Sequence, residues 1–329
     1  MAMKKRRVVI TGAAFPAEIA RVLEAHGLVI EAIPGTLDRD EIVSTLSGAW
    51  GYVQGGSERM TKDVWQKVPE LAVICFMGTG YHSFMQLPEN PVGMQFTYTP
   101  HANAEAVAEF TIALMLDMTR RVTERANEVR AGGWSEVATP SLIGARVGIA
   151  GMGRIGQEVA RMASSAFGAR VAYWNRSIRP ELRGLGYTRA DSIRELCAQV
   201  DLLSLGLAYK PGDNDGVIAE EELTLLGGSG ILVNTARAEL VDPVALREAL
   251  MAGRIAGAAM DGYYIEPTPE PHDDPYGLLA MTPRLLVTPH CAYLSHQAVH
   301  RMAAMAAENL LAVLEQRVPP YPVPALGTC

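Results

Sequence analysis

The sequence predicts an α/β fold of two doubly wound parallel-sheet domains, one inserted into the other. Short apolar strand patterns alternate with helical patterns, and this alternation runs through the chain twice. A glycine-rich turn between a strand and a helix lies in mid-chain rather than near the start. The sequence has 329 residues, 49% of them hydrophobic. This length is greater than a single hydrophobic core usually accommodates, so two domains are expected.

The first run of elements covers the N-terminal third of the chain. Its predicted strands are 8–11, 29–33, 50–54, 71–76 and 95–99. Its predicted helices are 17–26, 39–46 and 61–68. Apolar strands separated by crossover helices are typical of a parallel sheet that is buried on both faces.

The second run begins after Thr99-Pro100 and a long helical pattern from Asn103 to about Arg130. Its predicted strands start at Val147 and continue at 170–174, 202–205, 231–235, 256–260 and 285–288. Its predicted helices are 157–167, 192–199, 220–226 and 243–251, and a last helix covers 294–316. We therefore expect one domain from 1–100 plus 289–329 and an inserted domain from 101–288. A cleft between two such domains is a natural place for a small substrate.

The glycine-rich turn has the spacing GxGxxG, formed by Gly151, Gly153 and Gly156, and it joins a strand to a helix. Gly151 permits the tight turn, Gly153 allows the backbone to approach a pyrophosphate, and Gly156 allows close packing of helix on strand. The helix N-terminus presents N–H groups to the phosphates. This βαβ context predicts a Rossmann-like dinucleotide-binding domain.

The next strand ends at Asn175-Arg176-Ser177. An acidic residue at this position would bind the ribose hydroxyls of NAD. Here the carboxylate is missing, and the guanidinium of Arg176, which is able to bind a 2′-phosphate, stands beside this position. The sequence thus predicts NADP(H) as the preferred cofactor, with NAD(H) also possible.

A nicotinamide cofactor moves hydride, so the protein must move a proton and hold the carbonyl group. Arg237, Glu266 and His290 suit these tasks, and each follows a predicted strand. Open parallel sheets bind ligands at the carboxyl ends of their strands. We therefore predict that these three residues form the catalytic group.

The sequence resembles the D-isomer-specific 2-hydroxyacid dehydrogenase family, which includes glyoxylate/hydroxypyruvate reductases, D-lactate dehydrogenases and phosphoglycerate dehydrogenases. The resemblance covers nearly the whole sequence and is strongest from Pro100 to Ala292. The segments that carry it are the glycine loop, 100–109, 234–237 with 241–242, 253–261, 266–267 and 288–290.

The resemblance implies a role for each candidate. His290 would be the general acid/base, Glu266 the anion that favours the protonated imidazole, and Arg237 the group that binds the substrate carboxylate and carbonyl. Asp261 would orient the nicotinamide carboxamide. Further cofactor contacts are expected from Arg154, Ile155, Leu207, Thr235 and Ala236.

Two loops that follow strands of the first domain contain glycines. Their backbone N–H groups can cradle a carboxylate, and the family uses both places in this way. The expected substrate contacts there are Gln54, Gly55, Gly78, Thr79 and Gly80.

Several positions depart from the family pattern. His82 stands where many members carry Asp, and Gly206-Leu-Ala208 replaces a common His-x-Pro. Ala238 stands where Gly is usual, and Gly262-Tyr263 replaces a β-branched residue plus Phe. These departures leave the catalytic group intact but affect the surroundings of substrate and cofactor.

Other features narrow the function class. The net charge of −7, without a basic stripe, argues against nucleic acid as a partner. Cys75, Cys197, Cys291 and Cys329 are scattered, as expected for reduced thiols in a cytoplasmic protein. We expect no metal, because no carboxylate joins Cys291 and the following histidines at ligand spacing. No segment has the pattern of a signal peptide or membrane span.

We therefore expect an NADPH-preferring reductase of small 2-oxoacids such as glyoxylate or hydroxypyruvate. The helical stretch 103–130 resembles the family's dimer arm, and a homodimer is expected. One alternative is an NAD-linked dehydrogenase of D-lactate or of longer D-2-hydroxyacids. Another, from a different class, is a nucleotide-sensing, corepressor-like binding protein.

Overall fold

The computed structural model describes residues 6–12, 15–88 and 93–324. The protein divides into two compact units: unit 1 is Met1–Asn103 with Leu294–Cys329, and unit 2 is Ala104–Tyr293. The domain boundary predicted from the sequence placed residues 289–293 in the first domain, but these residues belong to unit 2. The physical reason is that the N–H groups of Cys291 and Ala292 donate to the side chain of Asp261, at the end of a unit 2 strand.

Unit 1 contains a sheet of five parallel strands in the order β2-β1-β3-β4-β5. The strands are β1 (Arg6–Gly12), β2 (Leu28–Pro34), β3 (Gly51–Gln54), β4 (Val73–Phe76) and β5 (Gln95–Tyr98). This is the strand order of flavodoxin-like domains. The order reverses between β1 and β3, and the loops after β3 and β4 leave the same edge of the sheet.

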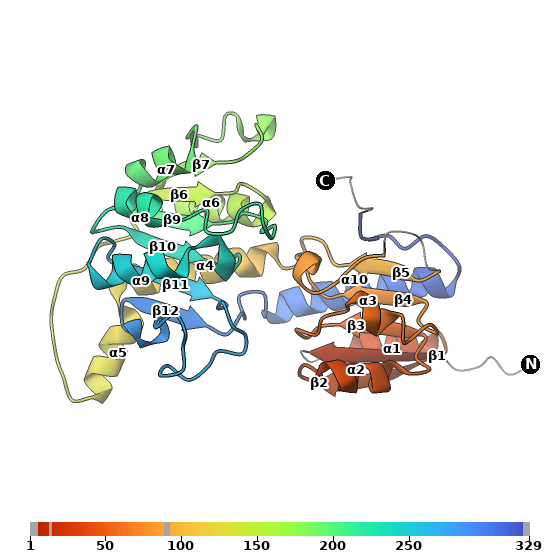
Figure 1. Ribbon diagram of the computed structural model, residues 1–329. Helices are drawn as coiled ribbons and strands as arrows, with labels where there is room; N and C mark the ends of the chain where they lie inside the picture. Colours follow the sequence, from red (N-terminus) through yellow and green to blue (C-terminus); the bar gives the residue numbers. More distant parts are fainter. Residues whose placement is uncertain (1–5, 13–14, 89–92, 325–329) are drawn as a thin grey trace, which may run out of the picture. The chain divides into compact units, whose positions relative to one another are not determined.

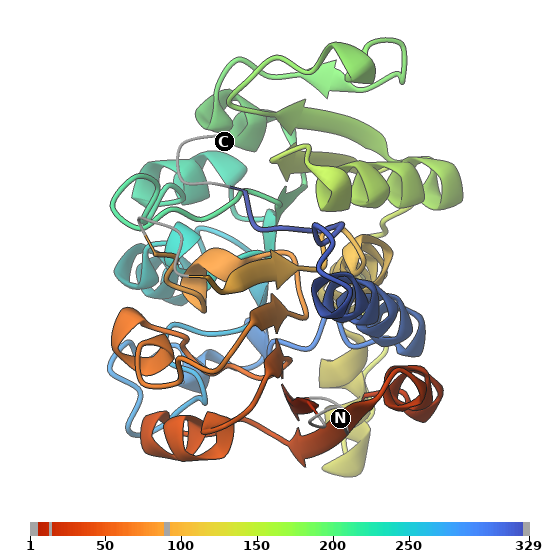
Figure 2. The ribbon, with the colours of Figure 1, turned by 90° about the vertical axis from the view of Figure 1, so that its right-hand side faces the viewer.

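Helices cover both faces of this sheet. Helices α1 (Ala17–Ala25) and α10 (His296–Leu314) lie on one face, and α2 (Arg39–Leu46) and α3 (Lys62–Trp65) lie on the other (Figure 2). A short 3₁₀ turn, η1 (Tyr81–Ser83), follows β4. The C-terminal helix therefore completes unit 1, although some 190 residues separate it from the N-terminal part.

Unit 2 contains a sheet of seven parallel strands in the order β12-β11-β10-β9-β6-β7-β8 (Figure 1). The strands are β6 (Arg146–Ala150), β7 (Arg170–Trp174), β8 (Thr188–Arg189), β9 (Leu202–Leu205), β10 (Ile231–Asn234), β11 (Gly257–Asp261) and β12 (Leu285–Thr288). This order is that of a Rossmann domain with one added strand. The predicted fold class is confirmed for both units.

Two apolar cores lie on opposite faces of this sheet. One core includes Leu202 and residues of α4 (Ala104–Arg120) and α6 (Arg154–Phe167). The other includes Leu203 and residues of α7 (Ile193–Gln199), α8 (Glu220–Leu226) and α9 (Pro243–Met251). Successive strand residues point to opposite faces, and the apolar runs in the sequence fill both cores. The remaining short turns are η2 (Pro180–Leu182), η3 (Ala238–Leu240) and η4 (Leu279–Met281).

The single helix expected over 103–130 is wrong. This segment forms α4 and then α5 (Val122–Arg130), separated by Arg121 in the left-handed region with φ 54°. The carboxylate of Asp117 accepts from the N–H and hydroxyl of Thr123 at 2.7 and 2.6 Å, and so caps the start of α5. An apolar pattern alone does not reveal such a break, because both helices keep helical spacing.

Candidate active site

The glycine loop joins β6 to α6 as a tight turn. Gly151 has φ 105°, and a Cβ at this position would lie 2.5 Å from the carbonyl carbon of Gly206. A Cβ at Gly156 would overlap the carbonyl oxygen of Gly151. Both glycines are therefore required by close backbone approach, which is the physical role that the spacing predicted.

The N-terminus of α6 suits an anionic ligand. Its N-cap residue is Gly153, and no side chain of the described residues caps the helix there. A Cβ at Gly153 would meet nothing within 4 Å, so the space in front of the helix is open. The N–H groups of the first turn, from Arg154 onward, thus face a cradle that fits the pyrophosphate of a dinucleotide.

Asn175 follows β7 and is tied into the glycine loop. Its side-chain oxygen accepts from the N–H of Met152 at 3.2 Å, and its amide donates to the carbonyl of Ser177 at 2.9 Å. Arg176 is largely exposed, and its guanidinium lies 3.4 Å from the carboxylate of Asp213. Sequence reasoning missed Asp213, because it comes from a loop more than thirty residues further along the chain.

That loop follows β9 and is held by its own side chains. Leu207, a predicted cofactor contact, is half-buried and packs against the core of unit 2. Beyond it, the hydroxyl of Tyr209 donates to Asp215 at 2.5 Å, and the side chain of Asn214 accepts from the N–H of Lys210 at 2.7 Å. These bonds fix the loop that carries Asp213 beside Arg176.

Arg237 lies in a turn directly after β10. Asn234 is buried, and its side chain bonds both the N–H of Ala236 and the carbonyl of Arg237 at 3.0 and 2.7 Å. Thr235, between them, shares a hydrogen bond of 2.8 Å with the hydroxyl of Thr111 on α4. The turn that carries the guanidinium is therefore fixed on two sides.

His290 and Glu266 form a close pair. Nδ1 of His290 lies 3.1 Å from each carboxylate oxygen of Glu266. His290 itself is in the left-handed region, with φ 53°. A pair in which a carboxylate holds Nδ1 leaves Nε2 as the ring nitrogen that can exchange a proton with a ligand.

Asp261, at the end of β11, holds the turn that contains His290. One carboxylate oxygen accepts from Thr288 at 2.6 Å and from the N–H of Cys291 at 2.9 Å, and the other accepts from the N–H of Ala292 at 2.8 Å. The residues that flank His290 on both sides are thus bonded to one buried side chain. The sequence did not indicate this structural role of Asp261.

The three candidate catalytic residues influence one another electrostatically. Burial raises the pKa of Glu266, but the bond and charge of His290, the N–H of Tyr263 and the charge of Arg237 outweigh burial and leave that pKa below its ordinary value. Burial lowers the pKa of Arg237, and the carboxylates of Glu239, Glu266 and Asp261 oppose this shift. Unit 2 therefore brings together an ionised carboxylate, an imidazole and a guanidinium.

The predicted substrate loops lie in unit 1, after β3 and β4. Gln54 is fully buried and donates to the carbonyl of Glu58. Gly55 packs against Thr11, since a Cβ there would lie 2.5 Å from its carbonyl oxygen. The side-chain oxygens Oε1 of Gln54 and Oε2 of Glu58 are buried without a hydrogen-bond partner among the described residues. Glu58 was not singled out from the sequence.

The second loop contains Gly78, Thr79 and Gly80. The hydroxyl of Thr79 donates to Asn103 at 3.0 Å and accepts from the N–H of His101 at 3.1 Å. His82, the departure noted in this loop, stacks on the ring of Tyr81 with centroids 4.1 Å apart. The hydroxyl of Thr79 is thus engaged in fixing the loop.

Three cysteines within the described ranges are free thiols, and Cys329 lies outside these ranges. Burial raises the pKa of Cys75 to about 11 and, together with Asp261, raises that of Cys291, so neither thiol is activated. Residues 6–12, 15–88 and 93–324 contain no cluster of three or more potential metal ligands. Within the same ranges, no helix is long and apolar enough to cross a membrane.

Comparison with known proteins gives concordant matches. Residues 112–292 match the family described as D-isomer specific 2-hydroxyacid dehydrogenase, NAD binding domain. A glyoxylate reductase from Aeropyrum pernix is 32% identical over 97% of this chain and 96% of its own length. A glyoxylate/hydroxypyruvate reductase B from Pectobacterium carotovorum is 34% identical over 83% of this chain and 85% of its own length.

A solved structure has the same architecture along its whole length. It is an NADPH-dependent glyoxylate/hydroxypyruvate reductase from Sinorhizobium meliloti, in complex with NADP and malonate. It is 27% identical, covers 98% of both chains, and superposes with a TM-score of 0.80. The similarity thus includes both units rather than the glycine-loop domain alone.

Proposed function

Because the chain belongs to the D-isomer specific 2-hydroxyacid dehydrogenase family, and is thus a nicotinamide-dependent oxidoreductase acting on CH–OH donors, we propose that it reduces glyoxylate or hydroxypyruvate with NADPH. The observation that carries the proposal is the pair of Glu266 with Nδ1 of His290, in the unit that also holds Arg237 and the glycine loop. This combination supports reduction of a carbonyl next to a carboxylate.

The proposed chemistry divides between the cofactor and three side chains. The bound nicotinamide supplies the hydride to the carbonyl carbon. Arg237 binds the substrate carboxylate and carbonyl oxygen with its planar set of donors. His290 gives the proton on Nε2 to the carbonyl oxygen as the C–O double bond becomes single. Glu266 stabilises the protonated imidazole through Nδ1 before this transfer.

We assign the cofactor site to the carboxyl ends of the unit 2 strands. Gly151, Gly153 and Gly156 with the first turn of α6 would hold the pyrophosphate. Other contacts are proposed for Arg154, Ile155, Asn175, Arg176, Ser177, Leu207, Thr235, Ala236 and Asp261. The open space before Gly153 and the uncapped helix support this assignment.

The preference for NADPH rests on Arg176. Arg176 and Asp213 expose 71% and 58% of their side chains, so their ion pair is weak and can give way to a 2′-phosphate. The relative from Sinorhizobium meliloti, whose structure contains NADP, supports this preference. The negative charge of Asp213 favours the second candidate, an NAD-linked D-2-hydroxyacid dehydrogenase, since it would repel the phosphate.

We propose that the substrate carboxylate also uses the backbone of the two unit 1 loops. The expected contacts are Gln54, Gly55, Gly78, Thr79 and Gly80. The side chain of Thr79, in contrast, is engaged in bonds that hold its own loop.

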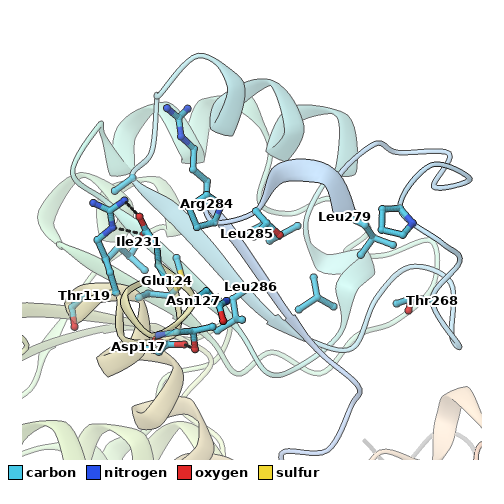
Figure 3. A pocket seen from close by; sticks show the side chains of 18 of the residues that line it. Asp117, Thr119, Glu124, Asn127, Ile231, Thr268, Leu279, Arg284, Leu285 and Leu286 are labelled. Carbon is cyan, nitrogen blue, oxygen red and sulfur yellow. Dashed lines mark hydrogen bonds and ion pairs between the residues drawn. The ribbon is translucent and has the colours of Figure 1, made fainter. Parts of the chain in front are cut away.

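We further propose a homodimer that uses α4, α5 and the segment 131–145 that follows them. This segment exposes large apolar side chains, including Trp134 at 80% and Ile143 at 76%. A cavity of about 720 Å³ lies between α5 and β12, with the labelled side chains of both elements around it (Figure 3). Exposed large apolar side chains favour association with a second copy. Sedimentation of the wild-type protein beside W134S tests this: a dimeric wild type and a smaller average mass for W134S are expected, and a monomeric wild type would refute the proposal.

We also propose a cytoplasmic location, because Cys75 and Cys197 are free, buried thiols. Cell fractionation tests this directly.

The decisive experiment follows nicotinamide absorbance with NADPH and NADH in parallel. The substrates are glyoxylate, hydroxypyruvate, pyruvate and a branched 2-oxoacid. Fast oxidation of NADPH with one of the first two acids is expected. Faster turnover with NADH and pyruvate would favour the second candidate, and cofactor binding without turnover would favour a nucleotide-sensing role.

A further inference from the structure

Asp274 is a buried carboxylate that lies outside the catalytic group. One of its oxygens accepts from the hydroxyl of Tyr263 at 2.7 Å and from the N–H groups of Leu278 and Leu279 at 2.6 and 2.9 Å. The other oxygen accepts from the N–H of Tyr276 at 3.2 Å. Burial raises the pKa of Asp274, but these donors outweigh burial and leave that pKa below its ordinary value. The carboxylate is therefore ionised and ties both ends of the loop 263–279 together.

Tyr263 connects this carboxylate to the catalytic group. Its ring is buried, with 4% of the residue exposed, and its hydroxyl is bonded to Asp274. Its backbone N–H donates to Oε1 of Glu266 at 3.0 Å. The same Oε1 lies 3.1 Å from Nδ1 of His290. Two hydrogen bonds of Tyr263, one from its hydroxyl and one from its backbone N–H, thus link Asp274 through the covalent frame of Tyr263 to Glu266 and His290.

We propose that Tyr263 and Asp274 are positioning residues that hold Glu266 against His290. The inference deepens the proposed function, because it assigns the fixation of the proposed acid/base pair to two residues outside it. An ionised carboxylate in a buried site is held firmly by its donors, since leaving it unsatisfied is costly. It can therefore act as a rigid anchor for the backbone that Tyr263 presents to Glu266.

This arrangement explains a departure seen in the sequence. The family pattern noted from the sequence has Phe at position 263, and a Phe ring could fill the same apolar space but could not bond Asp274. The buried hydroxyl of Tyr263 needs the carboxylate of Asp274, because without it the hydroxyl would be a buried donor with a missing partner. The preceding residue, Gly262, has no Cβ that could separate Glu266 from His290.

Three groups act directly on the carboxylate of Glu266. The imidazole of His290 contacts it directly, Arg237 acts through its charge, and the backbone N–H of Tyr263 donates to it. Asp261 and Glu239 act on Arg237 rather than on Glu266 itself. Because the Tyr263 donor lowers the pKa of Glu266, loosening this donor raises that pKa.

The test compares Y263F with Y264F. Tyr264 is the matched control, because it lies next along the chain and its hydroxyl donates to the carbonyl of Val241 at 2.8 Å rather than to Asp274. In Y263F we expect kcat to fall about tenfold, less than the 100-fold that a 1 Å misplacement can cost, with the KM for the 2-oxoacid almost unchanged. The acid limb of the kcat profile should move to higher pH, because Glu266 becomes easier to protonate. In Y264F the limb should stay in place.

A second readout does not depend on turnover. The carboxyl carbon of Glu266 can be followed by ¹³C NMR, with E266Q identifying the signal. Titration at higher pH in Y263F, but not in Y264F, supports the proposal whether or not glyoxylate is the substrate. Identical titration of Glu266 in the wild type and Y263F would overturn it. Absence of turnover in the wild type would instead refute the proposed function.

A third comparison uses position 274. In D274N the amide oxygen can still accept from Tyr263, Leu278 and Leu279, whereas D274A removes every acceptor. We expect D274N to keep the wild-type acid limb and D274A to shift it as Y263F does. Equal shifts in D274N and D274A would count against an anchoring role for the accepting oxygen. If D274A does not fold, Y263F decides the question.

Discussion

Both carboxylate oxygens of Glu266 lie 3.1 Å from Nδ1 of His290. The two residues are 24 positions apart and follow neighbouring strands, β11 and β12, which pair in parallel from Ala258 with Leu285 to Asp261 with Thr288. The register brings the carboxyl ends of these strands together, and Asp261 then bonds the backbone on the far side of His290. The imidazole is therefore held through both its ring and its main chain.

Replacing His290 with Ala should remove the proposed proton donor. We expect kcat for 2-oxoacid reduction to fall about 10²–10⁴-fold, while cofactor affinity, measured by quenching of protein fluorescence, stays near the wild-type value. H296A is the matched control, since His296 is an exposed residue at the start of α10. Turnover of H290A near the wild-type rate would refute the assigned acid.

Arg176 and Asp213 allow a test of cofactor choice. In R176A the KM for NADPH should rise about tenfold or more, with little change for NADH, because a charged hydrogen bond to phosphate is lost. In D213N the KM for NADPH should fall, because the repulsion and the competing ion pair disappear. An equal rise in the KM for NADPH and for NADH in R176A would remove the argument that Arg176 binds the 2′-phosphate. If the KM of D213N for NADPH equals that of the wild type, Asp213 has no part in cofactor choice.

Gly262 is a position where a single methyl group should disturb catalysis. It has φ 102°, and an added Cβ would lie 2.6 Å from Oε1 of Glu266. We expect G262A to lower kcat at least about tenfold by separating Glu266 from His290. G184A is the control for backbone strain alone. Gly184 also has a positive φ, 84°, but a Cβ there would meet nothing within 4 Å. A similar loss of kcat in both variants would contradict this explanation.

The pair of Arg146 and Asp201 should make stability depend on pH. The carboxylate of Asp201 accepts from the guanidinium of Arg146 at 2.5 and 3.1 Å and from the backbone N–H of Arg146 at 2.8 Å. The hydrogen bonds from the Arg146 side chain are the main reason why the pKa of Asp201 is lowered. A lowered folded-state pKa contributes stability above the unfolded-state value, and this contribution is lost as the pH falls through the folded-state value.

Urea denaturation should therefore show D201N less stable than the wild type at pH 7. The difference should shrink as the pH falls below about 4, the ordinary pKa of the unfolded chain, and should vanish as the pH passes the lower folded-state pKa of Asp201. D191N is the control, because Asp191 is 88% exposed. A difference between D201N and the wild type that is constant with pH would contradict the linkage.

Several features could be predicted from sequence because they depend on local chemistry. Apolar runs of strand length predicted eleven of the twelve strands found in the described residues, and among these strands only β8, two residues long, was missed. The glycine spacing predicted the β6–α6 turn, since Gly151 and Gly156 are required by close backbone contacts. The break at Arg121 was not predicted, because Asp117 caps α5 with no sign in the apolar pattern.

The sequence by itself determined the order of the strands and helices apart from β8 and the break between α4 and α5, the family, and which residues follow strands in the second unit. These follow from periodicity and from short motifs, in which each residue acts on its near neighbours. Only the tertiary structure decided the contacts of Asp213 with Arg176, of Asp261 with the His290 turn, and of Asp274 with Tyr263. Each joins polar groups that are distant in sequence. Parallel strands bring their carboxyl ends together, which places Asp213 near Arg176 and Asp261 near the His290 turn. The buried carboxylates of Asp261 and Asp274 also need donors, whatever their separation along the sequence.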